Sequence, residues 1–217
     1  MPTVEEIQQH FIEGLNAAIR RPGMFGPGEI GPDFMLREVL YVTGAEPGAW
    51  RAELEAAGAW SSIGVTGVVQ QLLPRDVQLA TASVYADYAH RHGWLELDCT
   101  LPEREYGELR DQLADYCATD HALAEILERF GEPSRISGGG RYPCVLGYAT
   151  AHDPIVWFYL WNGSNPGEPE SWPVFEEPVL LATRCGMAPL EERFTFTPEG
   201  QRRRPEPYEP WREMLAD

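Results

Sequence analysis

The chain has 217 residues, of which 43% are hydrophobic and 24% charged, so it can bury a core as one large domain or two small ones. Its 34 acidic residues face only 17 basic ones, all of them arginine, and the formal net charge is −17. The absence of lysine excludes a Schiff-base lysine, a lysine general base and a Walker A phosphate loop. So negative a field repels nucleic-acid phosphates and anionic lipid, and it attracts a basic protein.

The N-terminal residues MPTVEEIQQHF have neither the basic nor the apolar region of a secretory signal, and no apolar run approaches bilayer length. We therefore expect a cytoplasmic protein that does not contact a membrane. Its four cysteines lie far apart and form no C-x-x-C pair: Cys99, Cys117, Cys144 and Cys185. In a reducing compartment they are expected to be free thiols, and we expect neither a metal nor another cofactor.

Apolar residues at helical spacing predict helices through the first 93 residues. The first helix is expected to begin at a capping box of Thr3 and Glu6 and to end before Pro22 and Gly23. Further helices are expected near residues 32–42, 47–58 and 76–93. The stretch 61–74 fits a strand by its β-branched residues and a helix by its length, and we favour the helix.

From residue 94 the pattern changes. A strand is expected over 94–99, then a helix opened by a capping box of Thr100 and Glu103, then a helix over 120–131 that begins at Thr119 or Asp120. Clusters of glycine, proline and asparagine then separate four candidate strands, at 142–150, 154–161, 174–184 and 193–198. The tail, residues 201–217, is expected to be extended.

This order of elements predicts an α+β fold, with a helical N-terminal half followed by a mainly antiparallel β-sheet with packed helices. The division would place a helical region at residues 1–93 and an α+β region with the antiparallel sheet at residues 94–217. Because no strong linker separates them, the two regions are alternatively one continuous domain.

The segment RRPGMFG, residues 20–26, resembles the RPGMYIG piece of the ATPase subunits of type II topoisomerases. The resemblance, from Arg21 to Gly26, would imply an ATP site. Such a site also needs a metal-binding asparagine on a helix, a D-x-G-x-G motif and a phosphate-contacting lysine, and none of these follows here. We therefore interpret the segment as a helix end, from which Met24 and Phe25 return to the core.

Two segments contain residue types that bind anions or metals. Residues 134–143, SRISGGGRYP, would offer Arg135 and Arg141 to an anion, but a glycine-rich loop that leads into a strand favours a flexible β-connection. His90 and His92 are expected to interact with the C-terminal end of a helix rather than to hold a metal, because they lie on different faces of that helix.

A nucleophile site would require Cys117, Asp120 and His121 to lie on one continuous helix. The predicted helix start at Thr119 or Asp120 instead places a break between the cysteine and the histidine. Cys117 also falls on an apolar helix face, which favours a buried and inert thiol.

The strand over 154–161 and the loop after it suit binding. Trp157, Tyr159 and Trp161 share one face of the strand. If both faces are covered, this is the central strand of the sheet, and if the aromatic face is open, it is a platform for a partner. In the loop, Trp172 is either an anchor with an anionic rim or a buried residue under a solvated acidic loop, whose carboxylates are Glu168, Glu170, Glu176 and Glu177.

The sequence therefore predicts a non-catalytic, acidic, cytosolic protein that binds a basic protein partner through these aromatic and acidic residues, with its oligomeric state left open. A composition rich in alanine, glycine, proline and arginine suggests a bacterial source, and a toxin-neutralising immunity protein is then a concrete form by analogy of type. The alternative is a small-molecule enzyme, a hydrolase or transferase. Its site would lie between the helical half and the sheet and use His121 or His152 with Tyr159 or an arginine.

Overall fold

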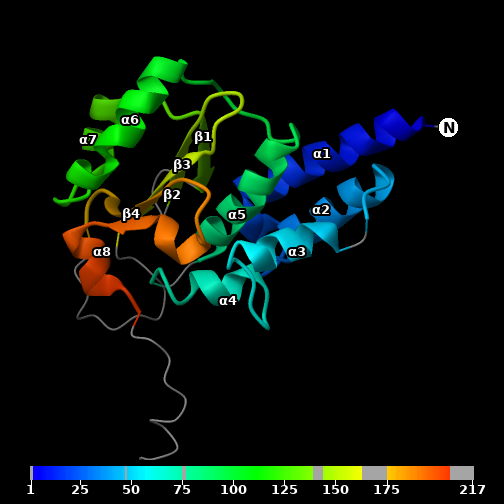
Figure 1. The fold of residues 1–217 in the computed structure, drawn as a ribbon, viewed down its shortest axis with the longest axis horizontal. Coiled ribbons are helices and arrows are strands. Elements are labelled where there is room, and N and C mark those ends of the chain that lie inside the picture. Colours follow the sequence, from blue (N-terminus) through cyan, green and yellow to red (C-terminus); the bar gives the residue numbers. More distant parts are fainter. Residues whose placement is uncertain (1, 47, 75–76, 139–143, 163–174, 206–217) are drawn as a thin grey trace, which may run out of the picture.

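The computed structural model describes residues 2–46, 48–74, 77–138, 144–162 and 175–205. Within these ranges the chain has the predicted α+β fold, in which helices precede an antiparallel sheet (Figure 1). The helices are α1 (Val4–Arg20), α2 (Ile30–Val42), α3 (Ala49–Ala56), α4 (Val65–Val69), α5 (Gln78–Arg91), α6 (Glu103–Tyr116), α7 (Leu123–Phe130) and α8 (Pro198–Arg203). The strands are β1 (Arg135–Gly138), β2 (Cys144–Tyr148), β3 (Val156–Trp161), β4 (Val179–Arg184) and β5 (Phe194–Phe196), and two 3₁₀ turns are η1 (Pro22–Met24) and η2 (Leu190–Arg193).

The sheet is an antiparallel meander in which each strand pairs with the next one along the chain, in the order β1-β2-β3-β4-β5. β3 is therefore the central strand. Its pairing with β4 changes register between Tyr159 and Leu160, which marks an irregularity in the middle of the sheet.

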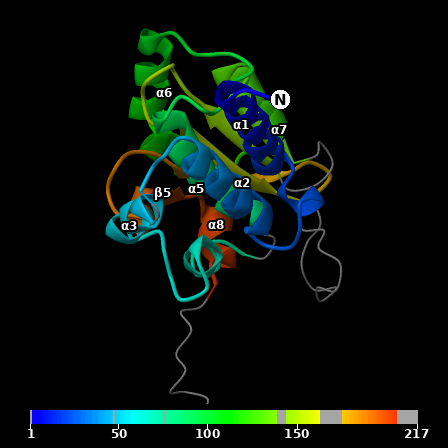
Figure 2. The same cartoon turned by 90° about the vertical axis from the view of Figure 1, so that its right-hand side faces the viewer.

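Helices cover both faces of this sheet, and the alternation of side chains along β3 sorts them into two cores. Trp157 and Tyr159 belong to a core formed with α1–α5, whereas Val156, Phe158 and Leu160 belong to a core under α6 and α7. Figures 1 and 2 show α6 and α7 on one side of the sheet and the N-terminal helices, with α5 nearest the strands, on the other. The first core joins residues of the N-terminal and C-terminal halves.

The first helix begins and ends as predicted. Thr3 Oγ1 accepts a hydrogen bond from Glu6 N at 3.2 Å, and Glu6 Oε2 accepts one from Thr3 N at 2.8 Å, which completes the capping box. α1 ends at Arg20, and Pro22 opens the turn η1. The prediction that Met24 returns to the core is wrong, because its side chain is 73% exposed.

The predicted strand at 94–99 is also wrong, because side chains of other elements bind its backbone. Asn16 Nδ2 donates to the carbonyl of Trp94 at 2.7 Å, and Asn16 Oδ1 accepts from the N–H of Glu96 at 2.8 Å. Arg135 Nη1 donates to the carbonyl of Glu96 at 2.6 Å. With these groups occupied, the segment runs beside α1 instead of joining the sheet.

Two predicted helix starts shift by a few residues. The N-cap of α6 is Pro102 rather than Thr100, since the N–H of Leu101 bonds to the Ala149 carbonyl at 2.8 Å and ties that residue to the end of β2. The N-cap of α7 is Ala122 rather than Thr119 or Asp120. Among the described residues, the favoured helix at 61–74 is reduced to α4, which covers only Val65–Val69.

Two elements appear where the sequence analysis expects none. The glycine-rich connection at 134–143 contains strand β1 at its start, and its residues 139–143 lie outside the described residues. α8 spans the end of the predicted strand at 193–198 and the start of the predicted tail, and Thr197 caps it by accepting a hydrogen bond from Gly200 N at 3.1 Å. No helix in the described part of the chain is long and apolar enough to cross a membrane.

Candidate functional site

The aromatic face of β3 is closed. Trp157, Tyr159 and Trp161 are 0%, 4% and 2% exposed, so the reading of β3 as a strand covered on both faces is confirmed and the open platform is wrong. Glu176 and Glu177 are exposed, as a partner surface requires. Glu168, Glu170 and Trp172 lie outside the described residues.

The closed face contains a buried polar network that joins α5 to the sheet. Arg184 of β4 forms an ion pair with Asp87 and donates through Nε to Tyr159 Oη at 2.6 Å and through Nη2 to Ser83 Oγ at 3.0 Å. Trp157 Nε1 donates to the other carboxylate oxygen of Asp87 at 2.7 Å. Ser83 Oγ and Tyr159 Oη are 2.9 Å apart. Every polar group of this network therefore has a partner, as buried polar groups require.

Electrostatics in the network keep Arg184 charged. Burial alone would lower the pKa of Arg184, but the Asp87 carboxylate and the hydrogen bond to Tyr159 raise it above its ordinary value. Burial raises the pKa of Tyr159, so its hydroxyl stays protonated. The network thus consists of the Arg184–Asp87 ion pair with the neutral groups of Trp157, Tyr159 and Ser83 hydrogen-bonded to it.

A cleft of about 190 Å³ opens beside this network, between α5 and the loops of the sheet. Asp87 belongs both to the network and to the wall of the cleft. The lining residues are Asp87, His90 and Arg91 from α5, residues 152–155 from the β2–β3 connection, and Gly186, Met187 and Arg193 from the β4–β5 connection. This is the junction of the helical half and the sheet, where the alternative enzyme reading expects a site.

The histidines of the cleft have no carboxylate partner in the part of the chain that the structure describes. His90 Nε2 lies 3.0 Å from the backbone carbonyl of Asp153, and because a carbonyl only accepts, this nitrogen carries the proton. His152 is exposed, and Tyr159 and His121 are not among the lining residues. A histidine bonded to an acid, the arrangement that would favour an enzyme, is therefore not formed by His90 or His152 within the described residues.

Arg193 is a cation of the cleft that forms no ion pair with a described residue. Its Nε donates to the Ala188 carbonyl, and no acidic side chain of the described ranges lies within ion-pair distance of it. Burial, and then the nearby positive charge of Arg184, lower the pKa of Arg193, and the Asp87 carboxylate offsets only part of this. Sequence reasoning missed Arg193, Asp87 and Arg184, and the available signals were an Asp within an apolar helix and an Arg that ends an apolar strand.

The predicted break between Cys117 and His121 is confirmed, and the two residues do not form a nucleophile site. Cys117 is buried with its Sγ 3.3 Å from Thr183 Oγ1, and burial raises the pKa of its thiol. His121 stacks on Tyr116 with ring centroids 3.8 Å apart. Asp120 accepts a hydrogen bond from Glu199 N at 2.6 Å and so caps α8 instead.

Other candidates serve the fold. Arg135 is fully buried and donates to the carbonyls of Glu96 and Asn16, and burial lowers the pKa of its guanidinium to about 10. It therefore cannot reach an anion in solvent, and Arg141 lies outside the described residues. His92 stacks on Trp94 at the end of α5. Among the described side chains, no group of three or more histidines, cysteines and acids is arranged to hold a metal.

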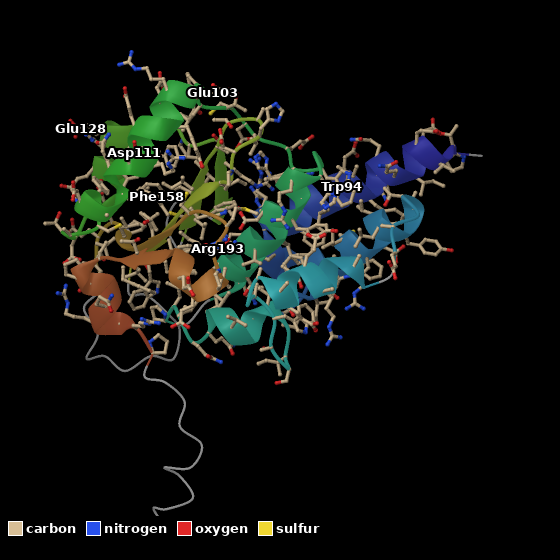
Figure 3. The ribbon with its side chains drawn as sticks, viewed as in Figure 1. Trp94, Glu103, Asp111, Glu128, Phe158 and Arg193 are labelled. Atoms are coloured by element: carbon tan, nitrogen blue, oxygen red, sulfur yellow. The ribbon has the colours of Figure 1, made fainter. Side chains whose placement is uncertain are left out.

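Exposed carboxylates gather over α6 and α7, in what we call the acidic layer. Its members are Glu103, Glu105, Glu108, Asp111, Asp115, Asp120, Glu125, Glu128 and Glu132, and all are exposed. Figure 3 shows Glu103, Asp111 and Glu128 on the outer side of these helices, away from the sheet. The inner side of α6 holds the apolar residues Tyr106, Leu109 and Leu113, so the layer is the solvent face of an amphipathic pair.

Comparisons of the chain with known proteins do not assign a function to the cleft or to the acidic layer. No protein-family model, no curated protein and no solved structure matches the chain.

Proposed function

We propose that the protein binds a basic protein partner and that the acidic layer is the surface that contacts it. The observation that supports this most directly is the charge of the layer. Seven of its nine carboxylates lie on α6 and α7 with only three arginines, namely Arg104, Arg110 and Arg129, and Asp120 pairs with Arg202 of α8 at 3.0 Å. Arg104 and Arg110 are already paired with Glu108 and Asp111 of the same helix, so they offer nothing to a negative partner.

The acidic layer continues toward the residues for which the sequence predicts partner binding. The N–H of Leu123 bonds to the Pro178 carbonyl at 2.9 Å, and Ala122 forms an isolated bridge with Val179. The exposed Glu176 and Glu177 directly precede Pro178 in the chain and therefore lie near this contact. A partner on the acidic layer would thus be within reach of them. The buried aromatic residues of β3 have no part in this contact.

The physical basis is long-range attraction. Clustered charge of one sign raises the association rate of an oppositely charged protein, and salt screens the effect over about 10 Å at 0.1 M. A side chain at the rim of such a surface adds little affinity when the partner leaves it solvated. We therefore propose steering by the layer, with Leu127 of α7, 39% exposed, as an apolar contact within it. A toxin-neutralising immunity protein remains one concrete form of this proposal.

Two charge-matched triple variants test the proposal. The first is Glu105→Gln, Asp115→Asn, Glu128→Gln, which removes three carboxylates of the acidic layer that form no ion pair with a described residue. The control is Glu5→Gln, Glu13→Gln, Glu46→Gln, which removes three exposed carboxylates outside the layer. Each immobilised protein is exposed to an extract of the source cell in about 0.05 M and about 0.5 M salt, and the retained basic proteins are identified and quantified.

The expected result is a basic protein retained by the native chain and the control at low salt, lost at high salt, and reduced at least about tenfold on the layer variant. Equal loss on both variants would mean that net charge alone attracts the protein and would overturn the assignment to this face. Retention unaffected by salt, or no basic protein at all, would overturn the proposed function.

A small-molecule enzyme is the second candidate, and the cleft beside α5 is the observation that favours it. The cleft lies where that reading expects a site and is lined by His152 and by arginines. Measuring turnover of small-molecule libraries by the native chain and by His152→Asn tests it. Activity that this substitution leaves unchanged would count against a histidine-based site.

A further inference from the structure

We infer that the cleft beside α5 binds a small oxyanion, the carboxylate or phosphoryl group of a small molecule, on the guanidinium of Arg193. This site is separate from the acidic layer, so the inference does not depend on partner binding. Figure 3 shows where Arg193 lies relative to α5, at the end of η2.

Arg193 has no counterion among the described residues, in a chain with twice as many acids as arginines. Its neighbours in the cleft and network are neutralised: Arg91 pairs with Glu53 at 3.2 Å, and Arg184 pairs with Asp87. Arg204, just after α8, pairs with Glu191 at 2.9 Å. A half-buried guanidinium without an anion is unfavourable, and an oxyanion from solution would remove that cost.

The guanidinium of Arg193 is held in one orientation. Nε of Arg193 is held by the Ala188 carbonyl, which orients the guanidinium and leaves the four terminal N–H groups without an acceptor among the described residues. Those groups form the fork that binds carboxylate or phosphate through two parallel hydrogen bonds. The turn that carries Arg193 is itself fixed, because buried Leu190 donates its N–H to the Ala57 carbonyl at 2.8 Å. The site is therefore preorganised.

Two acids, Asp87 and Asp153, line the cleft. Asp87 is used by Arg184 and Trp157, so its charge is compensated. Asp153 accepts a hydrogen bond from Thr150 at 2.7 Å but has no cation within ion-pair distance among the described residues. The lining thus holds one carboxylate and one guanidinium that form no ion pair with a described residue, which favours a ligand with a single oxyanion group over a polyanion.

The volume sets the size of the ligand. At about 190 Å³ the cleft is smaller than the roughly 300–1,000 Å³ of drug-sized sites. A nucleotide is therefore too large, whereas a molecule of a few heavy atoms with one oxyanion group fits.

The test titrates the ¹⁵N-labelled full chain with sodium acetate and, separately, with inorganic phosphate, at constant ionic strength set by sodium chloride. Chemical-shift changes are followed at Arg193 Nε and at the amides of Gly186 and Met187. The variants are Arg193→Gln, Arg193→Lys and, as the charge-matched control, Arg204→Gln, each checked for native fold by its spectrum.

We expect saturable shifts at these three groups with at least one of the two anions. Arg193→Gln should weaken binding about tenfold or more, Arg193→Lys should weaken it less because the charge remains without the fork, and Arg204→Gln should bind like the native chain. The preferred anion identifies the ligand as a carboxylate or a phosphoryl compound. Shifts that do not saturate with either anion, or equal affinities of the native chain and Arg193→Gln, would overturn the inference. If Arg193→Gln does not fold, the Arg193→Lys variant decides the test, and an affinity equal to that of the native chain would overturn the inference.

Discussion

Arg184 and Arg91 form ion pairs of similar composition in opposite surroundings. The side chains of Arg184 and Asp87 are 2% and 14% exposed, whereas those of Arg91 and Glu53 are 36% and 48% exposed. Water screens the exposed pair of Arg91 and Glu53. The charge of Arg184 is buried, so water cannot replace Asp87 as its partner. The same chemistry therefore contributes differently to stability at the two positions.

Substitution of Asp87 by Asn should lower the free energy of unfolding by about 3–5 kcal/mol, because it leaves the Arg184 charge buried and unpaired. The control Glu53→Gln removes an acid from the exposed pair and should change the free energy by no more than about 1 kcal/mol. Urea unfolding followed by tryptophan fluorescence measures both. Losses of equal size would contradict the role assigned to burial.

Single residues of the candidate site were predicted from the sequence only in part. The period of two along β3 correctly places Trp157 and Tyr159 on one face and Phe158 on the other. Whether that face is covered depends on α5, and the pairing of Asp87 with Arg184 joins residues 97 positions apart. Local patterns contain no information about such a contact.

At the scale of elements, two helical glycines differ in whether the surrounding structure leaves space for a side chain. A Cβ added to Gly107 in α6 would meet nothing within 4 Å. A Cβ added to Gly200 in α8 would lie 1.8 Å from the Leu181 carbonyl oxygen, far closer than two non-bonded atoms can approach. α8 therefore packs on β4 through a glycine, and this contact fixes the short helix to the sheet.

Gly107→Ala should raise the free energy of unfolding by about 0.5–1 kcal/mol, since alanine restricts the unfolded chain and favours the helix. Gly200→Ala, the same change in another helix, should lower it by at least about 1–3 kcal/mol because the backbone of α8 must move away from β4. Thermal and urea unfolding of both variants provide the measurement. A stabilised Gly200→Ala would show that α8 does not pack as described.

Elements with strong local signals were predicted well, and elements defined by partners were not. The Thr3–Glu6 capping box determines the start of α1 without help from the rest of the chain. The segment at 94–99 has a strand-like composition, but Asn16 and Arg135 bind its backbone and prevent it from pairing. The sequence did not predict α8 although Thr197 and Pro198 are a typical helix start, because the alternation before them extended the predicted strand to residue 198 and the proline-rich tail favoured an extended chain.

At the scale of the whole molecule, acidic groups oppose folding where the fold buries them. Glu29 accepts a hydrogen bond from the N–H of Thr66 at 3.0 Å. Burial raises the pKa of Glu29, the N–H of Thr66 partly offsets this, and the nearby Asp33 raises it further. A carboxyl group with a raised pKa stabilises the folded state below its unfolded pKa, and this contribution is lost as the pH rises through the folded value.

The native chain should therefore lose stability relative to Glu29→Gln as the pH rises from about 4.5 toward neutrality. The glutamine keeps an acceptor for Thr66 but cannot become charged. Glu46→Gln removes the same charge from an exposed position and serves as the control for net charge. Urea unfolding at a series of pH values measures the free energies of unfolding. If the native chain gained stability relative to Glu29→Gln as the pH rises, the result would contradict the burial argument.

The overall architecture followed from chain order more readily than the sites did. Helical periodicity in the first half and alternating runs in the second were enough to predict an α+β fold, because each strand pairs with its neighbour in sequence. The acidic layer and the cleft instead result from how α5, α6 and α7 pack on the two faces of the sheet. The periodicity of apolar residues in the sequence does not predict how these helices pack on the sheet.

The meander also limits how copies of this protein can associate. Within the described residues its outermost strands, β1 and β5, are four and three residues long, so each presents only a short row of backbone groups to an incoming strand. Fibril growth and sheet extension between molecules need longer templates, and mutual repulsion between chains of charge −17 adds a further barrier. Concentrated solutions at low ionic strength should accordingly resist amyloid-type aggregation.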